Sequence, residues 1–129
     1  MDTRQKIVET TSAETLTASA GARRIIVIAG FFDVLSARMV HQLKEIRASN
    51  AGAWIVAAVL DPEEPLLSNR ARCELAAGLN AIDQVVSLSK LSLTDFMAES
   101  HEAVLIDERE AHERISADLV QHVQQRQSA

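Results

Sequence analysis

The chain has few of the residues that support covalent, metal or nucleic-acid chemistry. Its one cysteine, Cys73, cannot form an intrachain disulfide and has no second thiol for a zinc site. Aromatic residues make up 3% of the sequence and tyrosine is absent, so surfaces that stack the bases of a nucleic acid are not expected. The net charge is −5, and the basic clusters Arg23-Arg24 and Arg70 with Arg72 are small. We therefore expect no nucleic-acid partner.

Long hydrophobic runs are also missing. The longest apolar run covers residues 25–32, which is far too short to cross a bilayer. The N-terminus, MDTRQKIVET, is polar and mixed in charge, unlike a secretory signal peptide. The sequence predicts a cytoplasmic protein with no membrane partner, and the apolar helical pattern around Cys73 predicts a buried structural thiol.

What is present indicates an ordinary globular domain. The chain has 129 residues, of which 47% are apolar and 24% charged. This length and composition predict one domain over residues 1–129 with a substantial core. Residues 1–22 are polar and rich in Thr, Ser and Ala, and we expect a helical extension there, with a helix over 13–21 capped by Ser12.

The apolar pattern alternates between strands and helices along the rest of the chain. Continuous β-branched or apolar runs predict strands over 23–30, 53–60, 83–88 and 102–107. Helical spacing predicts helices after Asp33 or Ser36, over 69–80, over 92–100 with Ser92 as its cap, and over 110–125. The predicted fold class is α/β, a Rossmann-like open parallel sheet of about four to five strands with helices on both faces.

Such a sheet binds ligands beyond the carboxyl ends of its strands, where the strand order reverses. The segments expected at this crevice are residues 30–38, residues 61–69 and the loop before the last helix. A flavodoxin-like strand order is the alternative, since it has the same rhythm of strands and helices.

Two stretches carry a resemblance to a known family. They are GFFDVL, residues 30–35, and RCELAAGLNAIDQVV, residues 72–86, with a weaker third match in RISADLVQHV, residues 114–123. Together they resemble the cytidylyltransferase-like nucleotidyltransferase superfamily, of the heptose-phosphate adenylyltransferase and glycerol-phosphate cytidylyltransferase type. The resemblance implies a nucleotide site at the turn after the first long strand, working with magnesium and CTP or ATP if the chain is active.

The departures from the family fall on its catalytic motif. The family's H-x-G-H is SARM here, so the two histidine positions are Ser36 and Met39, and the glycine is Arg38. Loss of one donor to a developing oxyanion typically costs about 2.7–4 kcal/mol of transition-state stabilisation. The motif therefore predicts a degenerate site with weak catalysis or none, and we assign no catalytic residue.

Several residues remain as candidates for nucleotide binding. Arg38 is the local replacement for the lost cationic groups, whereas Ser36 is better explained as a helix cap. Asp61 or Glu63 is the magnesium position only if the enzyme is active, and Ser116 is placed by the resemblance at a phosphate-binding helix start. The full candidate set is Gly30, Phe31, Phe32, Ser36, Arg38, Met39, Asp61, Arg72 and Ser116.

The four histidines do not fit a catalytic arrangement. His41 follows the motif on another helical face, and His112 and His122 are ten residues apart, without the spacing of a metal pair. Each is predicted to be a surface or partly packed side chain. Three functions stay open: a nucleotidyltransferase-like domain that is inactive or weak and retains nucleotide or phosphate binding, an active transferase with a rebuilt site, and a homo-oligomeric interaction module such as a homodimer.

Overall fold

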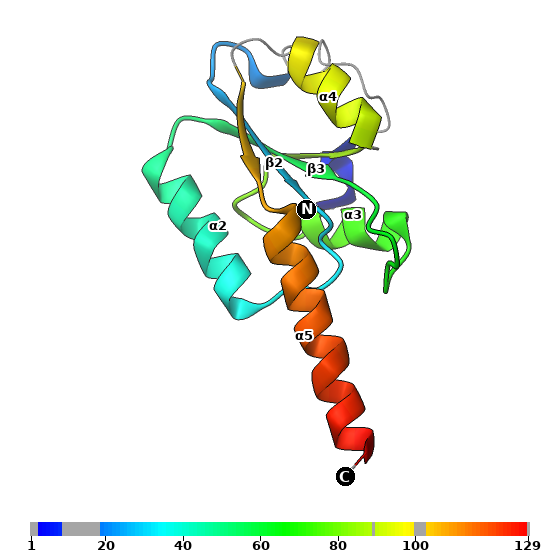
Figure 1. The fold of residues 1–129 in the computed structure, drawn as a ribbon. Coiled ribbons are helices and arrows are strands. Elements are labelled where there is room, and N and C mark those ends of the chain that lie inside the picture. Colours follow the sequence, from blue (N-terminus) through cyan, green and yellow to red (C-terminus); the bar gives the residue numbers. More distant parts are fainter. Residues whose placement is uncertain (1–2, 9–18, 89, 100–102, 129) are drawn as a thin grey trace.

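The computed structural model of this chain describes residues 3–8, 19–88, 90–99 and 103–128. In this part, five parallel strands form one sheet in the order β1-β4-β3-β2-β5 (Figure 1). The strands are β1 (Ile7–Val8), β2 (Ile25–Gly30), β3 (Trp54–Val59), β4 (Gln84–Ser87) and β5 (Val104–Asp107). The predicted Rossmann-like open parallel sheet is therefore confirmed.

The strand order locates the crevice of the sheet. From β2 the chain moves outward to β3 and β4, then crosses back to place β5 on the other side of β2. The order therefore reverses between β2 and β5, and their carboxyl ends, at Gly30 and Asp107, flank the crevice. If β2, β3, β4 and β5 are numbered 1 to 4, their order across the sheet is 3-2-1-4, whereas a flavodoxin-like sheet has the order 2-1-3-4. The flavodoxin-like alternative is therefore wrong.

Helices cover both faces of the sheet, as predicted. They are α2 (Ala37–Ser49), α3 (Asn69–Ala77), α4 (Lys90–Glu99) and α5 (Arg109–Ser128). Side chains of α2, α3 and the first half of α5 pack on one face, around Ile28, Ile55 and Val85. Leu93 and Phe96 of α4 pack on the other face. No helix in the described part of the chain is both long enough and apolar enough to cross a membrane.

The N-terminal segment differs from its prediction. Residues 3–6 form a short 3-10 helix, η1 (Thr3–Lys6), and β1 then pairs in parallel with β4 at the edge of the sheet. Lys6 anchors this segment by donating to the carbonyl oxygens of Leu79 and Ile82, at 3.3 and 2.9 Å. The polar extension thus contributes a strand to the sheet, whereas most of the helix predicted over 13–21 lies outside the described residues.

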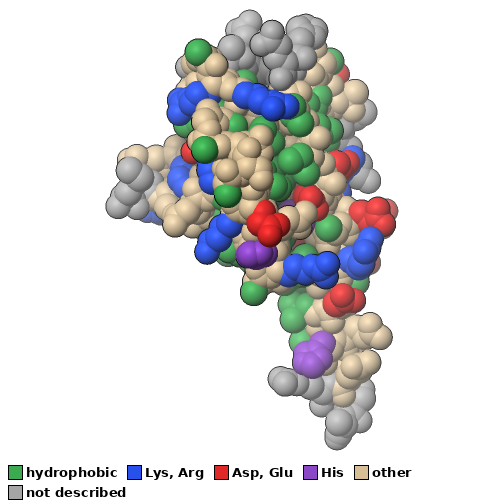
Figure 2. Space-filling model, turned by 90° about the vertical axis from the view of Figure 1, so that its left-hand side faces the viewer, with side chains coloured by type: hydrophobic (Ala, Val, Ile, Leu, Met, Phe, Trp, Pro, Cys, Tyr) green, Lys and Arg blue, Asp and Glu red, His purple; other side chains and the backbone are tan. Residues whose placement is uncertain are grey.

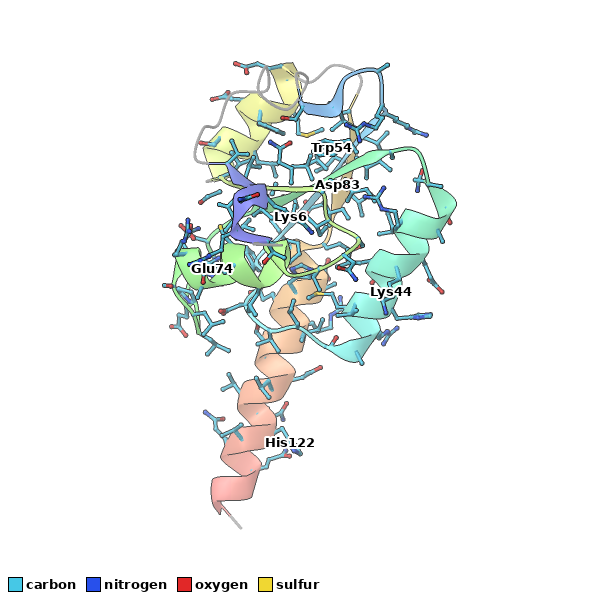
Figure 3. All side chains as sticks on the ribbon, turned by 180° about the vertical axis from the view of Figure 1, so that it is seen from behind. Lys6, Lys44, Trp54, Glu74, Asp83 and His122 are labelled. Carbon is cyan, nitrogen blue, oxygen red and sulfur yellow. The ribbon has the colours of Figure 1, made fainter. Side chains whose placement is uncertain are left out.

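Side-chain caps determine where two helices begin. Ser36 accepts from the backbone N–H of Met39 at α2, and Ser68 accepts from that of Ala71 at α3. The prediction of Ser92 as a cap is wrong, because α4 begins at Lys90 and includes Ser92. Asp83, at the entry to β4, accepts from Ile55 N at 2.8 Å and from Arg47 (Figure 3), which joins α2, β3 and β4.

Candidate functional site

The turn at the end of β2 presents two consecutive backbone N–H groups, and both donate to one histidine. The N–H groups of Phe31 and Phe32 lie 3.0 and 3.2 Å from Nδ1 of His112, on the first turns of α5. Successive N–H groups that converge on one point form a concavity that binds anions such as phosphate. Here the imidazole nitrogen occupies that point, so the turn is closed by the chain itself.

His112 is neutral in this arrangement. Because Nδ1 accepts two hydrogen bonds, the single ring proton of the neutral imidazole lies on Nε2. The side chain is buried, and burial lowers the pKa of His112 to about 4, although the nearby Asp107 carboxylate opposes this shift. The prediction that His112 is a surface or partly packed histidine is therefore wrong, since its exposed fraction is 3%.

Gly30 and Phe32 give the turn the shape that this contact requires. A Cβ atom at position 30 would lie 2.3 Å from Cε1 and Nδ1 of His112, so only glycine admits the ring. Phe32 has a φ of 53°, a left-handed conformation that is uncommon for a bulky residue. Its ring packs edge-on against the imidazole, with centroids 4.8 Å apart. The GFFD turn is thus built around His112 rather than around an open cavity.

Neither phenylalanine ring is free to stack on a nucleobase. Phe32 is fully buried in the cluster beneath α2 and α3, and Phe31 is buried on the opposite face, near Phe96. Both rings contribute to the core on the two sides of the sheet. The resemblance placed them in a nucleotide site, and the structure leaves only their backbone groups there.

Asp33 ties the loop after β3 to this turn. Its carboxylate accepts from the backbone N–H groups of Leu66 and Leu67, at 2.6 and 2.7 Å, and its side chain is buried. Asp33 therefore does not cap α2, which was one of two alternatives, and Ser36 does. The loop of residues 61–68 is held over the carboxyl ends of β2 and β3 by this contact.

Arg72 is a buried structural residue. Its guanidinium donates to the carbonyl oxygens of Leu60 at 2.6 Å, Leu67 at 3.2 Å and Phe31 at 3.3 Å, and it forms an ion pair with Asp61. Its exposed fraction is 1%. The Arg72 guanidinium holds the pKa of the Asp61 carboxyl below its ordinary value. Both residues belonged to the candidate nucleotide site. The Arg72 guanidinium is directed at the protein, whereas the Asp61 carboxylate pairs with it through Oδ1 and stays largely exposed.

The residues at the degenerate motif are only partly available to a ligand. Ser36 uses its hydroxyl oxygen as the cap of α2, and Met39 is buried in the core. Arg38 is exposed on the first turn of α2 and has no ion-pair partner among the described residues. Of these three, Arg38 is the side chain positioned to meet an anion.

A groove of about 260 Å³ lies between α2 and α5, beside the closed turn. Its floor is apolar, with Met39, Leu43, Ile46 and Ile115, and Arg38 and Arg114 stand on its two helices. His112 forms part of its wall. The groove therefore combines an apolar floor with two exposed cationic side chains and with two acidic residues, Glu108 and Asp118. Arg38 lies next to the N-terminus of α2, where the helix dipole favours anions.

Ser116 is displaced from its expected position. The last helix begins at Arg109, so Ser116 lies two turns inside α5 and not at a helix start. It does not line the groove. The expectation that its hydroxyl stands at a phosphate-binding helix terminus is therefore wrong.

The residues suggested for magnesium do not form a cation site. Asp61 is engaged by Arg72 and also accepts from the Asn69 side chain at 3.0 Å. Within the described ranges, no group of three or more His, Cys, Asp or Glu side chains could hold a metal ion. The acidic loop thus supplies hydrogen bonds within the protein and is not arranged for a divalent ion.

No protein-family model matches this chain, and no curated protein matches its sequence. The assignment to the nucleotidyltransferase superfamily therefore stays a prediction that rests on the quoted motifs.

His112 is the residue that sequence reasoning missed. Its partners at the β2 turn, Phe31 and Phe32, lie 81 and 80 residues away in the sequence. One signal was available: with Ile115 and Leu119 it continues the apolar stripe of the last helix at helical spacing, which places it on the side facing the domain. A histidine on a buried stripe needs a polar partner, and the end of the neighbouring strand offers one.

Proposed function

We propose that this chain is a nucleotidyltransferase-like domain that does not transfer nucleotides and acts by binding. The observation that carries the proposal is the pair of hydrogen bonds from Phe31 N and Phe32 N to His112 Nδ1. In a transferase of this type, such groups would stabilise the charge on the phosphates as pyrophosphate leaves. Met39 is buried and its thioether cannot donate, and the hydroxyl oxygen of Ser36 already accepts from Met39 N, so of the motif residues only Arg38 presents a cationic group in their place.

The binding site in this proposal is the α2–α5 groove. Arg38 would hold an anionic group such as a phosphate, and the apolar floor of Leu43, Ile46 and Ile115 would contact the sugar or base of a nucleotide. Pockets that enclose small ligands measure about 300–1,000 Å³. At about 260 Å³ the groove covers only part of a nucleotide, so we expect binding at high micromolar to millimolar concentrations.

Thermal unfolding with millimolar CTP or ATP, with and without magnesium, tests the proposal. At ten times the dissociation constant a ligand adds about 1.4 kcal/mol, which raises the midpoint of a chain of this size by several degrees. We expect such a rise with one nucleotide, equal with and without magnesium because the acidic loop forms no cation site. Arg38→Ala should remove the rise.

Lys44→Ala is the matched control. Lys44 lies on the same helix, is exposed, and stands on the side of α2 away from the groove (Figure 3). The same samples are assayed for pyrophosphate release, and none is expected. Magnesium-dependent release would favour the active transferase instead, and an unchanged midpoint with every nucleotide would refute binding in the groove.

A further inference from the structure

The wall of the α2–α5 groove contains a hydrogen-bond donor that the protein does not use. Nδ1 of His112 accepts from Phe31 N and Phe32 N, so the ring proton lies on Nε2. Among the residues that the structure describes, none accepts a hydrogen bond from this Nε2–H. The donor belongs to a side chain of which only 3% is exposed.

This N–H opens into the groove. In the described part of the chain, every polar side-chain atom that is sealed from solvent has a hydrogen-bond partner. Nε2 has no partner, so it is not sealed, and the groove is the cavity that His112 lines. The two N–H groups of the β2 turn hold the ring from its Nδ1 side. Nε2–H is therefore a fixed donor that points away from the protein and toward a ligand.

A fixed donor of this kind selects the ligand that fills the groove. A ligand that covers Nε2–H without offering an acceptor leaves a buried polar group unpaired, and such ligands are rejected more strongly than those that lack only an apolar contact. The floor beside it is apolar, with Leu43, Ile46 and Ile115. Together they favour a flat ring that carries an oxygen or nitrogen acceptor, as every nucleobase does.

The charges of the groove favour one phosphate over three. Arg38 has no ion-pair partner among the described residues, whereas Arg114 already pairs with Glu110 at 3.0 Å. The carboxylates of Glu108 and Asp118 line the same groove. Charged side chains of both signs gather where the root of α5 joins the body (Figure 2). A second or third phosphate would therefore meet negative charge without a further unpaired cation.

We propose that the α2–α5 groove binds a nucleoside monophosphate, with its phosphate on Arg38 and an acceptor atom of its base on Nε2–H of His112. This proposal rests on the proposed function, because it names the ligand class of the same groove. The volume of about 260 Å³ favours the smaller bases, the pyrimidines. Cytidine monophosphate is therefore the probe, since its base carries both a carbonyl and a ring-nitrogen acceptor.

Titration of the full chain with cytidine monophosphate, followed by ¹⁵N NMR without magnesium, tests the proposal. We expect the Nε2 signal of His112 to shift as the groove fills, while the amide signals of Phe31 and Phe32 stay in place, because their contacts lie on the Nδ1 side of the ring. Ribose 5-phosphate has no base, so it should bind about tenfold more weakly and leave Nε2 unchanged. CTP should bind about two- to fivefold more weakly than the monophosphate.

Asp118→Asn tests the charge argument. Removal of this carboxylate should reduce the difference between CTP and the monophosphate by about twofold. Glu113→Gln is the matched control, because Glu113 is exposed on the same helix but does not line the groove. An equal gain in Glu113→Gln would contradict the assignment of the repulsion to the groove.

The NMR titration separates this proposal from the one on which it rests. If no groove signal responds to any of these compounds, nucleotide binding in the groove is wrong, and the ligand class is wrong with it. If groove signals shift with the monophosphate but the Nε2 signal does not, the groove binds nucleotides and the role given to His112 is overturned. Tighter binding of CTP than of the monophosphate would overturn the preference for one phosphate.

Discussion

Replacing Arg72 with methionine is expected to lower the free energy of unfolding by about 3–5 kcal/mol. The change leaves the carbonyl oxygens of Leu60, Phe31 and Leu67 without their donor, and each unpaired buried group costs about 1–3 kcal/mol. Loss of the ion pair itself adds little, because the Asp61 side chain is 62% exposed and stays solvated without Arg72. Urea unfolding monitored by circular dichroism measures the change.

Arg70→Met is the matched control for this prediction. Arg70 is two residues away on the same helix, but its side chain is 57% exposed and pairs with Glu74 across one turn. Exposed pairs of this kind contribute about 0.3–0.5 kcal/mol. If Arg72→Met were no more destabilising than Arg70→Met, the account of Arg72 as the buried link between the β2 turn and the loop of residues 61–68 would be wrong.

Replacing His112 with alanine is expected to have a comparable effect, about 3–4 kcal/mol of lost stability. The N–H groups of Phe31 and Phe32 would lose their acceptor, and a cavity would form beside the ring of Phe32. His112→Asn should recover part of this loss, because its amide oxygen is an acceptor close to the position of Nδ1. Urea unfolding at pH 7.5 of the three proteins tests the order wild type, Asn, Ala.

The same histidine predicts a specific dependence of stability on pH. The pKa of His112 is lowered from 6.5 to about 4 in the folded chain, so between these values the unfolded chain binds more protons than the folded one. Stability therefore rises with pH across this window, is fully present above pH 6.5, and is lost as pH falls toward 4. The full effect is roughly 3 kcal/mol, from the size of the shift.

His112→Asn provides the control for the pH dependence. This variant keeps an acceptor at position 112 but does not titrate, so its loss of stability between pH 7 and pH 5 should be smaller than that of the wild type. The pKa values of Asp61 and Asp107 are lowered by Arg72 and Arg109, so these two groups change the stability only at pH values below this window. Equal slopes for the two proteins would show that His112 is not the group responsible.

The fold could be predicted because its signals are local. The β-branched run that ends at Gly30 and the apolar run that ends at Leu60 are each typical of a buried parallel strand, and Ser36 is a standard helix cap. β1 was missed because its two residues carry no strand pattern of their own. They form a strand only because β4 offers a free edge about 80 residues later.

The site was predicted less well because its contacts join distant segments. The turn of residues 30–33 was predicted at the end of the first long strand, where it lies, yet Arg72 and Asp33 were assigned to a ligand and to a cap. Their partners are backbone groups on other loops, such as Leu66 N, 33 residues from Asp33. Whether a polar side chain meets a ligand or the protein depends on how the loops close, and the spacing of residues in the sequence does not contain that information.

¹⁵N NMR of the His112 ring and of the Phe31 and Phe32 amides tests directly whether the chain closes its own phosphate position. We expect a neutral imidazole at pH 7 with its proton on Nε2, and titration near pH 4. We also expect that neither amide signal shifts on addition of millimolar CTP or ATP with magnesium, even where signals of the α2–α5 groove do. A ring that titrates near pH 6.5, together with Phe31 and Phe32 amides that respond to nucleotide, would contradict the claim that the chain closes its own phosphate position.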